Sequence, residues 1–509
     1  MTLYGNHIAG EIHDQGATFE NDTVNGERST FTRGTVAHVE QATHAAADAF
    51  NTFGRSTRAQ RAELLDAIAD EIDKRGDNIT AMGMAETGLP EARLEGERGR
   101  TQGQLRQFAE LIKTDAYLDI RHDKALPDRE PMPRPDLRLM QRPLGPIAVF
   151  GASNFPLAFS TAGGDTASAL AAGCPVVVKG HPGHPGTAAI VAEAIDAAIA
   201  RCGVHPGTFS QINDGGPDNN GADSRAVGAA LVQSHPIKAV GFTGSLAGGR
   251  ALFDLACQRT EPIPFFGELG SVNPVFVLPS AAEARSVEIA NQWVASLTLG
   301  VGQFCTNPGI IVVPAASAKV FEAAALSALK DVSAASMLTT NIALAYRNGV
   351  KAMSSHALVR TLHSTDSVGR EATPTLVAVN AVDFIANPEL AQEIFGPAGI
   401  IVLAESVDEI QAIANTMEGQ LTATMQLDVA DHPVAAKLLP ALENKAGRIL
   451  CNGFPTGVEV ADAMMHGGPY PASTNSATTS VGTLAIRRFQ RPVSYQNFPE
   501  ALLPDELVS

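Results

Sequence analysis

The chain has few cysteines, and they are far apart in the sequence. Only five occur among 509 residues, and no two of them form a CxxC pair. A disulfide framework or a structural zinc site needs closely and regularly spaced cysteines, so the sequence argues against both. This usage is typical of a reducing compartment, and we expect no bound metal. The five are Cys174, Cys202, Cys257, Cys305 and Cys451.

The chain also lacks an excess of positive charge and long apolar runs. Lys and Arg number 37 against 54 Asp and Glu, which leaves a formal net charge of −17. This balance argues against nucleic acid or an anionic membrane surface as the main partner. No apolar run approaches the roughly 18–20 residues needed to cross a bilayer, and the start, MTLYGNHIAG, lacks the layout of a secretory signal. We therefore expect a cytoplasmic protein without nucleic-acid or membrane partners.

What is present is an ordinary globular composition in a long chain. Hydrophobic residues make up 45% and charged residues 18% of the sequence, as in a typical soluble globular protein. A chain of this length exceeds what one simple core supports, so we predict two or three domains.

The first part of the chain is predicted to be helical and then extended. Residues 36–55 and 56–74 carry Ala, Leu and Ile at three- and four-residue spacing, which predicts amphipathic helices. A third helix, dense in Arg and Glu, is expected over 90–114. Residues 125–146 are rich in proline, which excludes a helix interior and favours an extended crossing segment or an edge strand.

From Gly145 onward, short apolar runs alternate with Ala-rich stretches. This alternation predicts βαβ units and a parallel sheet covered on both faces. A second alternating region runs from 275 to about 455, and the tail over 467–499 predicts an extended arm that pairs within this chain or with a partner subunit. The strands expected are 147–150, 175–179, 208–213, 239–243, 309–313 and 399–404, and two of the helices between them are 158–171 and 187–201.

Two short segments carry the chemistry. Cys305 lies among small and polar residues in Gly-Gln-Phe-Cys-Thr, and Glu268 precedes it in Phe-Gly-Glu-Leu-Gly. A thiol with a lone carboxylate upstream suggests a covalent thiol enzyme with a carboxylate base, although a single cysteine is more often a small buried hydrophobe. In addition, strand 239–243 runs into a glycine-rich turn before a helix, which can hold a phosphate on backbone N–H groups.

Six segments, taken in order, resemble the aldehyde dehydrogenase superfamily over essentially the whole chain. The resemblance implies an α/β fold with a Rossmann-like cofactor domain, an α/β catalytic domain and a small β oligomerisation arm. It implies an NAD(P)-binding domain over 1–124 and 146–266, a catalytic domain over 267–466, and an oligomerisation segment over 125–145 and 467–509 of a homodimer or homotetramer. The segments are FGASNFP around Asn154, PVVVK ending at Lys179, FTGS ending at Ser245, GELG with Glu268, GQFCT with Cys305, and EIFGP beginning at Glu393.

The resemblance implies three catalytic roles. Cys305 would be the nucleophile that attacks the aldehyde carbon to give a thiohemiacetal and then a thioester. Glu268 would be the general base that activates water, and its apolar neighbours Phe265 and Phe266 predict a raised pKa. Asn154 would hold the developing oxyanion together with the backbone N–H of Cys305.

The resemblance also implies an NAD(P) site. Lys179 would meet the adenosine ribose, Gly244 and Ser245 the pyrophosphate, and Glu393 and Phe395 the nicotinamide ribose and ring. Many NAD-preferring relatives carry a glutamate three residues after the lysine, where this chain has Pro182. Because this carboxylate is missing, and because Lys179 has histidines nearby, we expect NADP as the preferred cofactor and NAD as the alternative.

The phrases GERGRT, GQLRQFA and QFCTNPG are similar to the branch that oxidises α-ketoglutaric semialdehyde (2,5-dioxopentanoate) to 2-oxoglutarate. A fatty or other aliphatic aldehyde stays open as the substrate, and so does a non-catalytic relative with a binding or structural role. One arginine of the 90–114 helix could grip a distal substrate carboxylate, although helical Arg/Glu runs are usually solvated faces. The four arginines considered are Arg93, Arg98, Arg100 and Arg106.

Overall fold

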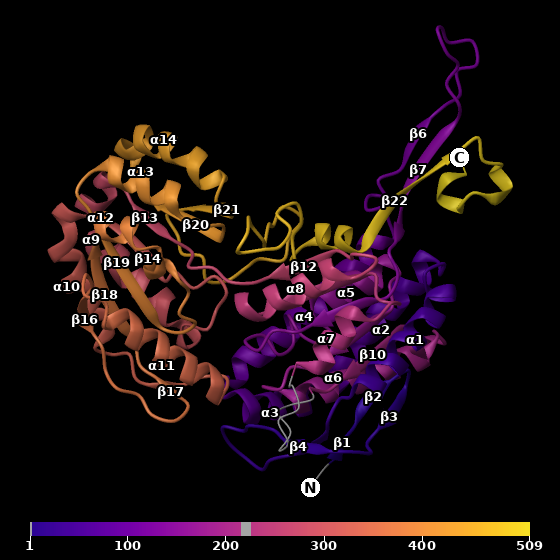
Figure 1. The fold of residues 1–509 in the computed structure, drawn as a ribbon, viewed down its shortest axis with the longest axis horizontal. Coiled ribbons are helices and arrows are strands. Elements are labelled where there is room, and N and C mark those ends of the chain that lie inside the picture. The colour runs from indigo at the N-terminus through magenta and orange to yellow at the C-terminus, as the bar shows by residue number, and fades with distance from the viewer. Residues whose placement is uncertain (1–2, 215–224, 509) are drawn as a thin grey trace.

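The computed structural model describes residues 3–214 and 225–508. Figure 1 shows two lobes side by side and a thin arm that rises from the first lobe. Within the described residues, each lobe is built on a seven-stranded sheet. After the last strand of the second lobe, the chain returns to the first lobe, where Leu269 N–H donates to the Ala472 carbonyl.

The sheet of the first lobe has the strand order β12-β11-β8-β9-β10-β2-β3. The five strands from β12 to β10 are parallel, and β2 and β3 extend the sheet in antiparallel fashion. Their bounds are β2 (Asn6–Ile8), β3 (Glu11–His13), β8 (Ile147–Phe150), β9 (Val176–Lys179), β10 (Phe209–Ile212), β11 (Ala239–Thr243) and β12 (Phe265–Glu268).

Helices cover both faces of this sheet. Val176 and Val178 of β9 pack in a core with α2, α4, α5 and α6, whereas Val177 packs on the other face with α1, α7 and α8. Successive side chains of a strand point to opposite faces, so a strand buried on both faces is a continuous apolar run. The helices are α1 (Val36–Phe53), α2 (Arg58–Lys74), α3 (Gly76–Thr87), α4 (Glu91–Ile112), α5 (Gly164–Ala172), α6 (Pro185–Cys202), α7 (Ala226–Gln233) and α8 (Leu246–Gln258).

The sheet of the second lobe has the order β16-β18-β19-β14-β13-β20-β21, and only β16 runs antiparallel among its strands. Val312 packs with α11 to α14, and its neighbour Val313 packs with α9 and α10 on the other face. The strands are β13 (Val275–Val277), β14 (Ile310–Pro314), β16 (Arg360–His363), β18 (Thr375–Asn380), β19 (Ala398–Ala404), β20 (Gln420–Gln426) and β21 (Ala446–Cys451). The helices are α9 (Pro279–Thr298), α10 (Ala318–Leu329), α11 (Thr340–Ser354), α12 (Ala381–Ala386), α13 (Val407–Thr416) and α14 (His432–Glu443).

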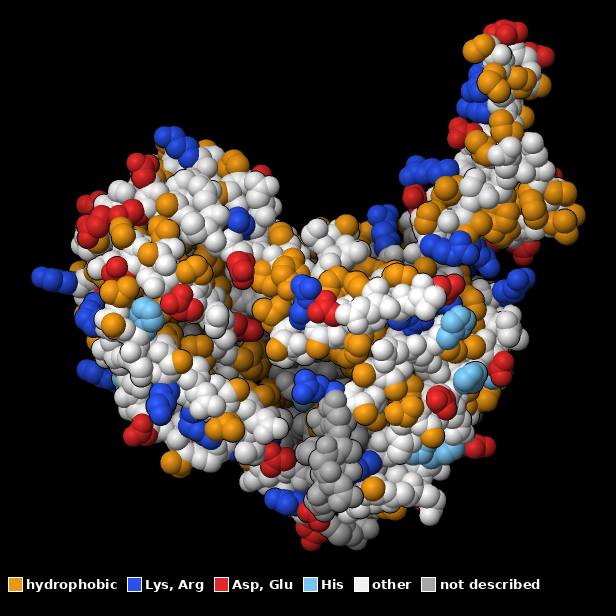
Figure 2. Space-filling view, in the orientation of Figure 1, with side chains coloured by type: hydrophobic (Ala, Val, Ile, Leu, Met, Phe, Trp, Pro, Cys, Tyr) orange, Lys and Arg blue, Asp and Glu red, His pale blue; other side chains and the backbone are white. Residues whose placement is uncertain are grey.

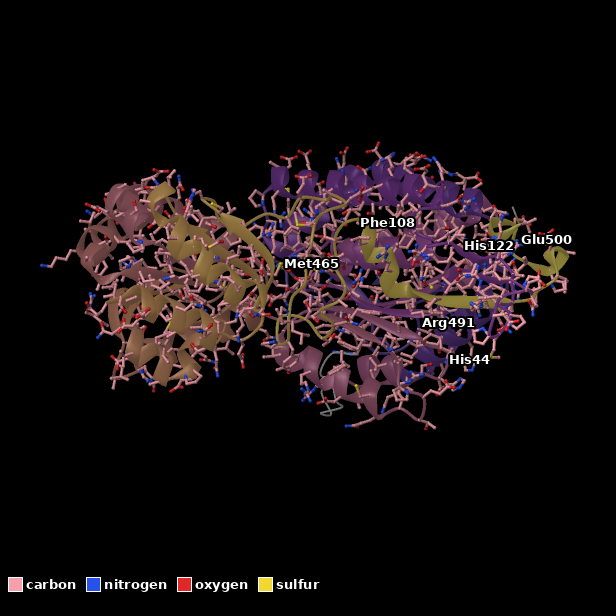
Figure 3. The ribbon with its side chains drawn as sticks, turned by 90° about the horizontal axis from the view of Figure 1, so that it is seen from above. His44, Phe108, His122, Met465, Arg491 and Glu500 are labelled. Carbon is pink, nitrogen blue, oxygen red and sulfur yellow. The ribbon has the colours of Figure 1, made fainter. Side chains whose placement is uncertain are left out.

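The arm is a three-stranded antiparallel sheet with β7 at its centre. The proline-rich segment is therefore extended, and the tail pairs with it inside the same chain. Figure 3 shows His122 and Glu500 in this region, far from Met465 at the junction of the lobes. The arm strands are β6 (Arg121–Asp123), β7 (Leu137–Pro143) and β22 (Gln490–Gln496); smaller sheets contain β1 (Leu3–Tyr4), β4 (Thr18–Glu20) and β5 (Thr30–Thr32), and β15 (Ala335–Ser336) with β17 (Glu371–Ala372).

The predicted α/β fold class, with parallel sheets between helices, is confirmed. The helix expected over 158–171 begins only at Gly164, and α3 was not predicted because its buried face is largely Gly, Thr and Glu. The domain boundaries and the role of the arm in subunit association stay predictions. No helix in the described part of the chain is long and apolar enough to span a membrane.

Candidate active site

Cys305 follows a sharp backbone turn between α9 and β14. Gly300, Val301 and Gly302 all have positive φ angles, of 57°, 59° and 64°. A Cβ on Gly302 would lie only 2.4 Å from the carbonyl group of Gly396, so glycine is required there. Asn307 Nδ2 also donates to the Gly396 carbonyl at 3.1 Å. The turn therefore packs the Cys305 segment against the EIFGP segment, which is far away in the sequence.

Glu268 is the last residue of β12, and its carboxylate faces the thiol across the gap between the lobes. Its Oε1 lies 3.0 Å from His466 Nε2, and the same nitrogen lies 3.4 Å from Cys305 Sγ. Ser480 Oγ donates to Glu268 Oε2 at 3.1 Å. The thiol, the imidazole and the carboxylate thus form a contiguous hydrogen-bonded group, in which the last two are buried and Cys305 is partly exposed.

His466 was not identified from the sequence. It belongs to the segment that returns from the second lobe to the first, where its N–H donates to Thr479 Oγ1 at 2.9 Å and its carbonyl accepts from Ser480 N–H. The surrounding sequence, Met-Met-His-Gly-Gly, has no motif that marks a catalytic histidine. Only the tertiary contact with Cys305 and Glu268 identifies it.

The three groups shift one another's titration. Burial raises the pKa of Cys305 well above its usual value, and the nearby carboxylate of Glu268 adds to the rise. Burial also acts to raise the pKa of Glu268, but the charge and hydrogen bond of His466, with hydrogen bonds from Cys305 and Ser480, outweigh it and lower that pKa. The prediction that apolar neighbours raise the pKa of Glu268 is therefore wrong, because the sequence did not reveal the contact with His466.

The same group has the ligand types of a metal site. One potential ligand atom from each of Glu268, Cys305 and His466 lies within 4.8 Å of the others, and thiolate, imidazole and carboxylate are the donors that zinc prefers. The prediction of no bound metal is not tested by this geometry and stays a prediction.

Asn154 lies in the loop after β8, beside the Cys305 segment. Its Nδ2 donates to the Gln303 carbonyl at 2.9 Å. The loop is held by Glu97 of α4, whose Oε1 accepts the N–H groups of Leu157 and Ala158 at 2.8 and 2.9 Å. The structure thus brings Asn154 to the thiol, and its predicted role as an oxyanion donor stays a prediction.

Cys305 borders two cavities. A cleft of about 1940 Å³ between the lobes is lined by Cys305, Glu268 and Asn154, and Figure 2 shows the surface hollowed between the lobes. A smaller pocket of about 240 Å³ is lined by Cys305 together with Phe155, Phe304 and residues of α4. The thiol is therefore open to a large molecule on one side and a small one on the other.

The cleft contains the glycine-rich turn between β11 and α8. Gly244 and Ser245 line it, and Ser245 caps α8 by accepting the Gly248 N–H at 3.3 Å. A Cβ on Gly244 would lie 2.8 Å from the ring of Phe242. A helix N-terminus facing a cleft offers free N–H groups and a favourable dipole to a phosphate.

Lys179 ends β9 near the same cleft, but its charge has a partner. Its Nζ lies 3.2 Å from Asp214 Oδ1, and Asp214 lines the cleft. Burial lowers the pKa of His181 well below its usual value, and His184 and Lys179 act in the same direction. His181 therefore adds no positive charge near neutral pH, contrary to the argument from the sequence.

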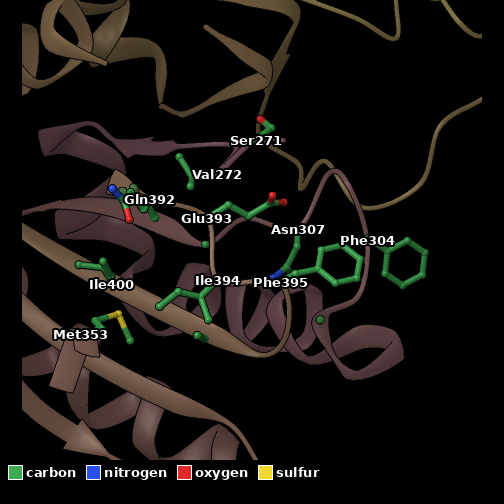
Figure 4. A pocket seen from close by; sticks show the side chains of 14 residues that line it. Ser271, Val272, Phe304, Asn307, Met353, Gln392, Glu393, Ile394, Phe395 and Ile400 are labelled. Atoms are coloured by element: carbon green, nitrogen blue, oxygen red, sulfur yellow. The ribbon is translucent and has the colours of Figure 1, made fainter. Parts of the chain in front are cut away.

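Glu393 and Phe395 lie on the wall of the cleft opposite the turn. Figure 4 shows Glu393 among Ser271, Val272 and Asn307, at a cavity of about 20 Å³. Burial raises the pKa of Glu393 to about 8, and the charge of Glu268 adds to the rise. The cleft thus brings together all the predicted cofactor residues except Lys179. That lysine does not line the cleft but pairs with Asp214, which does.

Comparison with known proteins finds a matching family model and relatives with similar sequences. A family model described as "Aldehyde dehydrogenase family" matches residues 20–482. The chain is 51% identical over 474 residues to an α-ketoglutaric semialdehyde dehydrogenase 2 of Azospirillum brasilense, covering 92% of this chain and 89% of that protein. It is 48% identical over 484 residues to an α-ketoglutaric semialdehyde dehydrogenase of Acinetobacter baylyi, covering 94% and 90%.

Solved structures share the fold at low sequence identity. A 1-pyrroline-5-carboxylate dehydrogenase from Thermus with bound NAD superposes with a TM-score of 0.81 at 20% identity, covering 97% of this chain and 92% of that one. A 3,6-anhydro-L-galactose dehydrogenase, described as a complex with NAP, gives a TM-score of 0.81 at 19% identity, covering 97% and 100%. With a matching family model over most of its length and relatives near half identity, the chain belongs to the aldehyde dehydrogenase family.

Proposed function

We propose that the chain oxidises an aldehyde to a carboxylic acid through a thioester on Cys305, with NAD(P) as the hydride acceptor. The observation that carries the proposal is the position of Cys305 between the large cleft and the small pocket. A cofactor in the cleft and an aldehyde in the pocket would meet at the sulfur. His466 and Glu268 lie next to the sulfur and can move protons.

The first step forms a bond between Cys305 Sγ and the aldehyde carbon. Because the pKa of Cys305 is raised, the thiol is protonated at neutral pH, and its proton must leave as the bond forms. The ionised Glu268, which accepts a hydrogen bond from the thiol, is the adjacent acceptor, and His466 Nε2 donates to its Oε1 at 3.0 Å. Glu268 then passes this proton to solvent. Asn154 Nδ2 and the backbone N–H of Cys305 would hold the negative oxygen, and one such donor contributes about 3–4 kcal/mol.

A nicotinamide held in the cleft beside Glu393 and Phe395 would supply the hydride acceptor that converts the thiohemiacetal on Cys305 into a thioester. Glu268 then takes a proton from water as the oxygen adds to the thioester carbon. The carbon–sulfur bond breaks, the acid leaves, and Glu268 gives its proton to the sulfur. Aldehyde, NAD(P)⁺ and water thus give acid, NAD(P)H and a proton.

The residues of the cleft fit a dinucleotide. The capped N-terminus of α8 suits the pyrophosphate, and the Glu393 carboxyl group can form hydrogen bonds with the hydroxyl groups of a ribose. We propose NADP as the preferred form, supported by Lys179 and by the absence of a carboxylate at Pro182. Asp214 competes for the same lysine. A higher kcat/KM with NADP than with NAD, reduced more for NADP than for NAD by Lys179→Met, would support this preference; the reverse ranking would overturn it.

For the substrate we propose 2,5-dioxopentanoate, which gives 2-oxoglutarate. The support is the function named for the relatives from Azospirillum brasilense and Acinetobacter baylyi, at 51% and 48% identity. No observation favours the fatty-aldehyde alternative or a non-catalytic role. We also propose a homodimer or homotetramer associated through the arm, and the cytoplasmic location stays a prediction.

The test is NAD(P)H formation followed by absorbance at 340 nm. The substrates are 2,5-dioxopentanoate, succinic semialdehyde, pentanal and a long-chain aldehyde, each with NAD and with NADP. We expect kcat/KM for 2,5-dioxopentanoate to be at least about tenfold above that for the long-chain aldehyde, a difference of about 1.4 kcal/mol. Better turnover of the long-chain aldehyde would contradict the proposed substrate. No NAD(P)H formation with any of the aldehydes would contradict the proposed activity.

A further inference from the structure

The small pocket beside Cys305 has a mainly aromatic wall and a cationic wall. Phe155, Phe159 and Phe304 line one part of it, and the helix α4 supplies Arg93 and Arg100. These two arginines are seven residues apart, about two helical turns, so they lie on the same face of α4. A small molecule attached to the sulfur would extend along this face.

Three of the four arginines on α4 have other partners. Arg98 donates to Thr80 Oγ1 at 3.1 Å, and Arg106 pairs with Asp70 at 2.9 Å on the surface. Arg93 lies over the rings of Phe155 and Phe304, at 4.4 and 5.3 Å, and faces Glu97 Oε2 at 3.7 Å. Their positive charges are therefore already solvated, paired or stacked.

Arg100 also lies over a ring, that of Phe159, at 5.7 Å, but its hydrogen bonds differ from those of the other three. Its Nη1 donates to the Val458 carbonyl, but its Nε and Nη2 are buried and have no hydrogen-bond partner among the described residues. Burial lowers the pKa of Arg100, while Glu97 and Cys305 act in the opposite direction. Leaving buried guanidinium donors without partners is costly, so this side chain is prepared for a ligand that supplies acceptors.

The rest of the site keeps Arg100 in this orientation. Arg448 donates to the carbonyls of Pro455 and Gly457 at 2.7 and 3.1 Å, and so holds the loop that carries Val458. In the Glu97 carboxylate beside it, Oε1 accepts two backbone N–H groups. Oε2 has no hydrogen-bond partner among the described residues and lies 3.7 Å from Arg93. Neither neighbour satisfies Nε and Nη2 of Arg100.

We propose that Arg100 binds the terminal carboxylate of the substrate through Nε and Nη2, which makes it the residue that selects short aldehydes bearing a carboxylate. The inference rests on the proposed function, in which the aldehyde carbon of the same molecule lies at Cys305. The Nε and Nη2 hydrogens of a guanidinium are parallel and match the two oxygens of a carboxylate. An uncharged aldehyde would leave these donors unpaired, so the enzyme would discriminate against it.

The test compares Arg100→Met and Arg100→Lys with Arg106→Met, a control on the exposed side of the same helix. Kinetics are measured with 2,5-dioxopentanoate and with pentanal, which has no carboxylate. We expect Arg100→Met to raise KM for 2,5-dioxopentanoate about 10- to 100-fold, the range for a hydrogen bond to a charged group. Arg100→Lys should fall between Arg100→Met and the unchanged protein, because lysine keeps the charge without the paired donors.

Turnover of pentanal shows that each variant is folded and that its sulfur is active. Its kcat/KM should change by less than about threefold in Arg100→Met, and Arg106→Met should leave both substrates unchanged. An unchanged KM for 2,5-dioxopentanoate in Arg100→Met, or an equal loss for both aldehydes, would overturn the inference.

A binding measurement separates this inference from the proposed function. The product 2-oxoglutarate carries the same carboxylate, and it should slow the labelling of Cys305 by iodoacetamide. This protection should be lost in Arg100→Met and kept in Arg106→Met. If the unchanged protein oxidises no aldehyde but 2-oxoglutarate still protects Cys305 in this way, the proposed function is wrong and the carboxylate site is supported. If oxidation is observed without protection by 2-oxoglutarate, the function stands and the carboxylate site is wrong.

Discussion

At the scale of single residues, the chemistry depends on a histidine in contact with both the thiol and the carboxylate. His466 Nε2 lies 3.4 Å from Cys305 Sγ and 3.0 Å from Glu268 Oε1. A thiol whose pKa is raised by burial reacts slowly unless a base removes its proton. In the reaction that we propose, Glu268 is this base, and the hydrogen bond from His466 Nε2 holds its carboxylate in place.

Replacing His466 by asparagine should therefore slow the reaction without unfolding the protein. We expect His466→Asn to lower kcat/KM by up to about 100-fold, the low end of the contribution of general acid–base catalysis, because Glu268 loses the imidazole that holds it. His44→Asn, at an exposed position shown in Figure 3, is the matched control and should have no effect. A His466→Asn enzyme with unchanged kcat/KM across pH would show that the imidazole takes no part.

The effect of the Glu268 charge on the pKa of the Cys305 thiol should also be measurable. This carboxylate raises the pKa of Cys305, so Glu268→Gln should lower the pKa of the thiol. The thiolate is the form that reacts, and each unit of lowering increases its fraction about tenfold at pH values below the pKa. Iodoacetamide labelling of Cys305 should therefore be faster at neutral pH and reach its midpoint at lower pH. Slower labelling would mean that the role of Glu268 as a base outweighs the effect of its charge on the pKa of the thiol.

At the scale of elements, α4 connects the loop that carries Asn154 to the small pocket beside Cys305. Glu97 accepts the N–H groups of Leu157 and Ala158, and one turn away Arg100 lines the pocket. The helix after β8 begins at Gly164 rather than near 158. The backbone of 157–158 bonds to a carboxylate of α4, and the residues after it form turns.

Removing this carboxylate should destabilise the first lobe. We expect Glu97→Ala to lower the free energy of unfolding by about 1–3 kcal/mol, because two buried N–H groups lose their acceptor. Burial raises the pKa of Glu97, so the neutral side chain of Glu97→Gln is a close substitute that keeps one acceptor oxygen. Thermal unfolding should show a lower midpoint for Glu97→Ala than for Glu97→Gln. Equal midpoints would mean that the loop does not depend on this acceptor.

At the scale of the whole molecule, the arm leaves apolar side chains uncovered. Met132 and Leu502 are 69% and 67% exposed, and Figure 2 shows hydrophobic side chains along the arm and near the C-terminal turns. Exposed apolar surface of this kind is typical of an interface.

Charges at these two positions should therefore dissociate the oligomer that we propose. Light scattering should give a dimer or tetramer for the unchanged chain and a smaller species for the Met132→Asp, Leu502→Asp double variant. Val429→Asp is the control, because Val429 is 80% exposed on the other lobe and should not alter the mass. A monomer for the unchanged chain would overturn the oligomeric state.

The sequence alone was enough for the fold class and for most of the site. The apolar strand 147–150 was predicted at its observed bounds, because a strand buried on both faces needs a continuous apolar run. Cys305, Glu268 and Asn154 each lie in a short local motif, and the structure brings all three together. These features depend on local propensity and on residues close together along the chain.

Tertiary structure decided the features that depend on contacts between distant segments. Sequence reasoning missed His466, whose partners lie 161 and 198 residues away, and it gave the wrong direction for the pKa of Glu268. It also left four arginines of α4 equivalent, whereas burial and partners distinguish Arg100. The residue types present and their local conformations can be derived from the sequence. Electrostatics and hydrogen bonding act through space, so which charges are paired and which buried donors are left free is determined only by the folded chain.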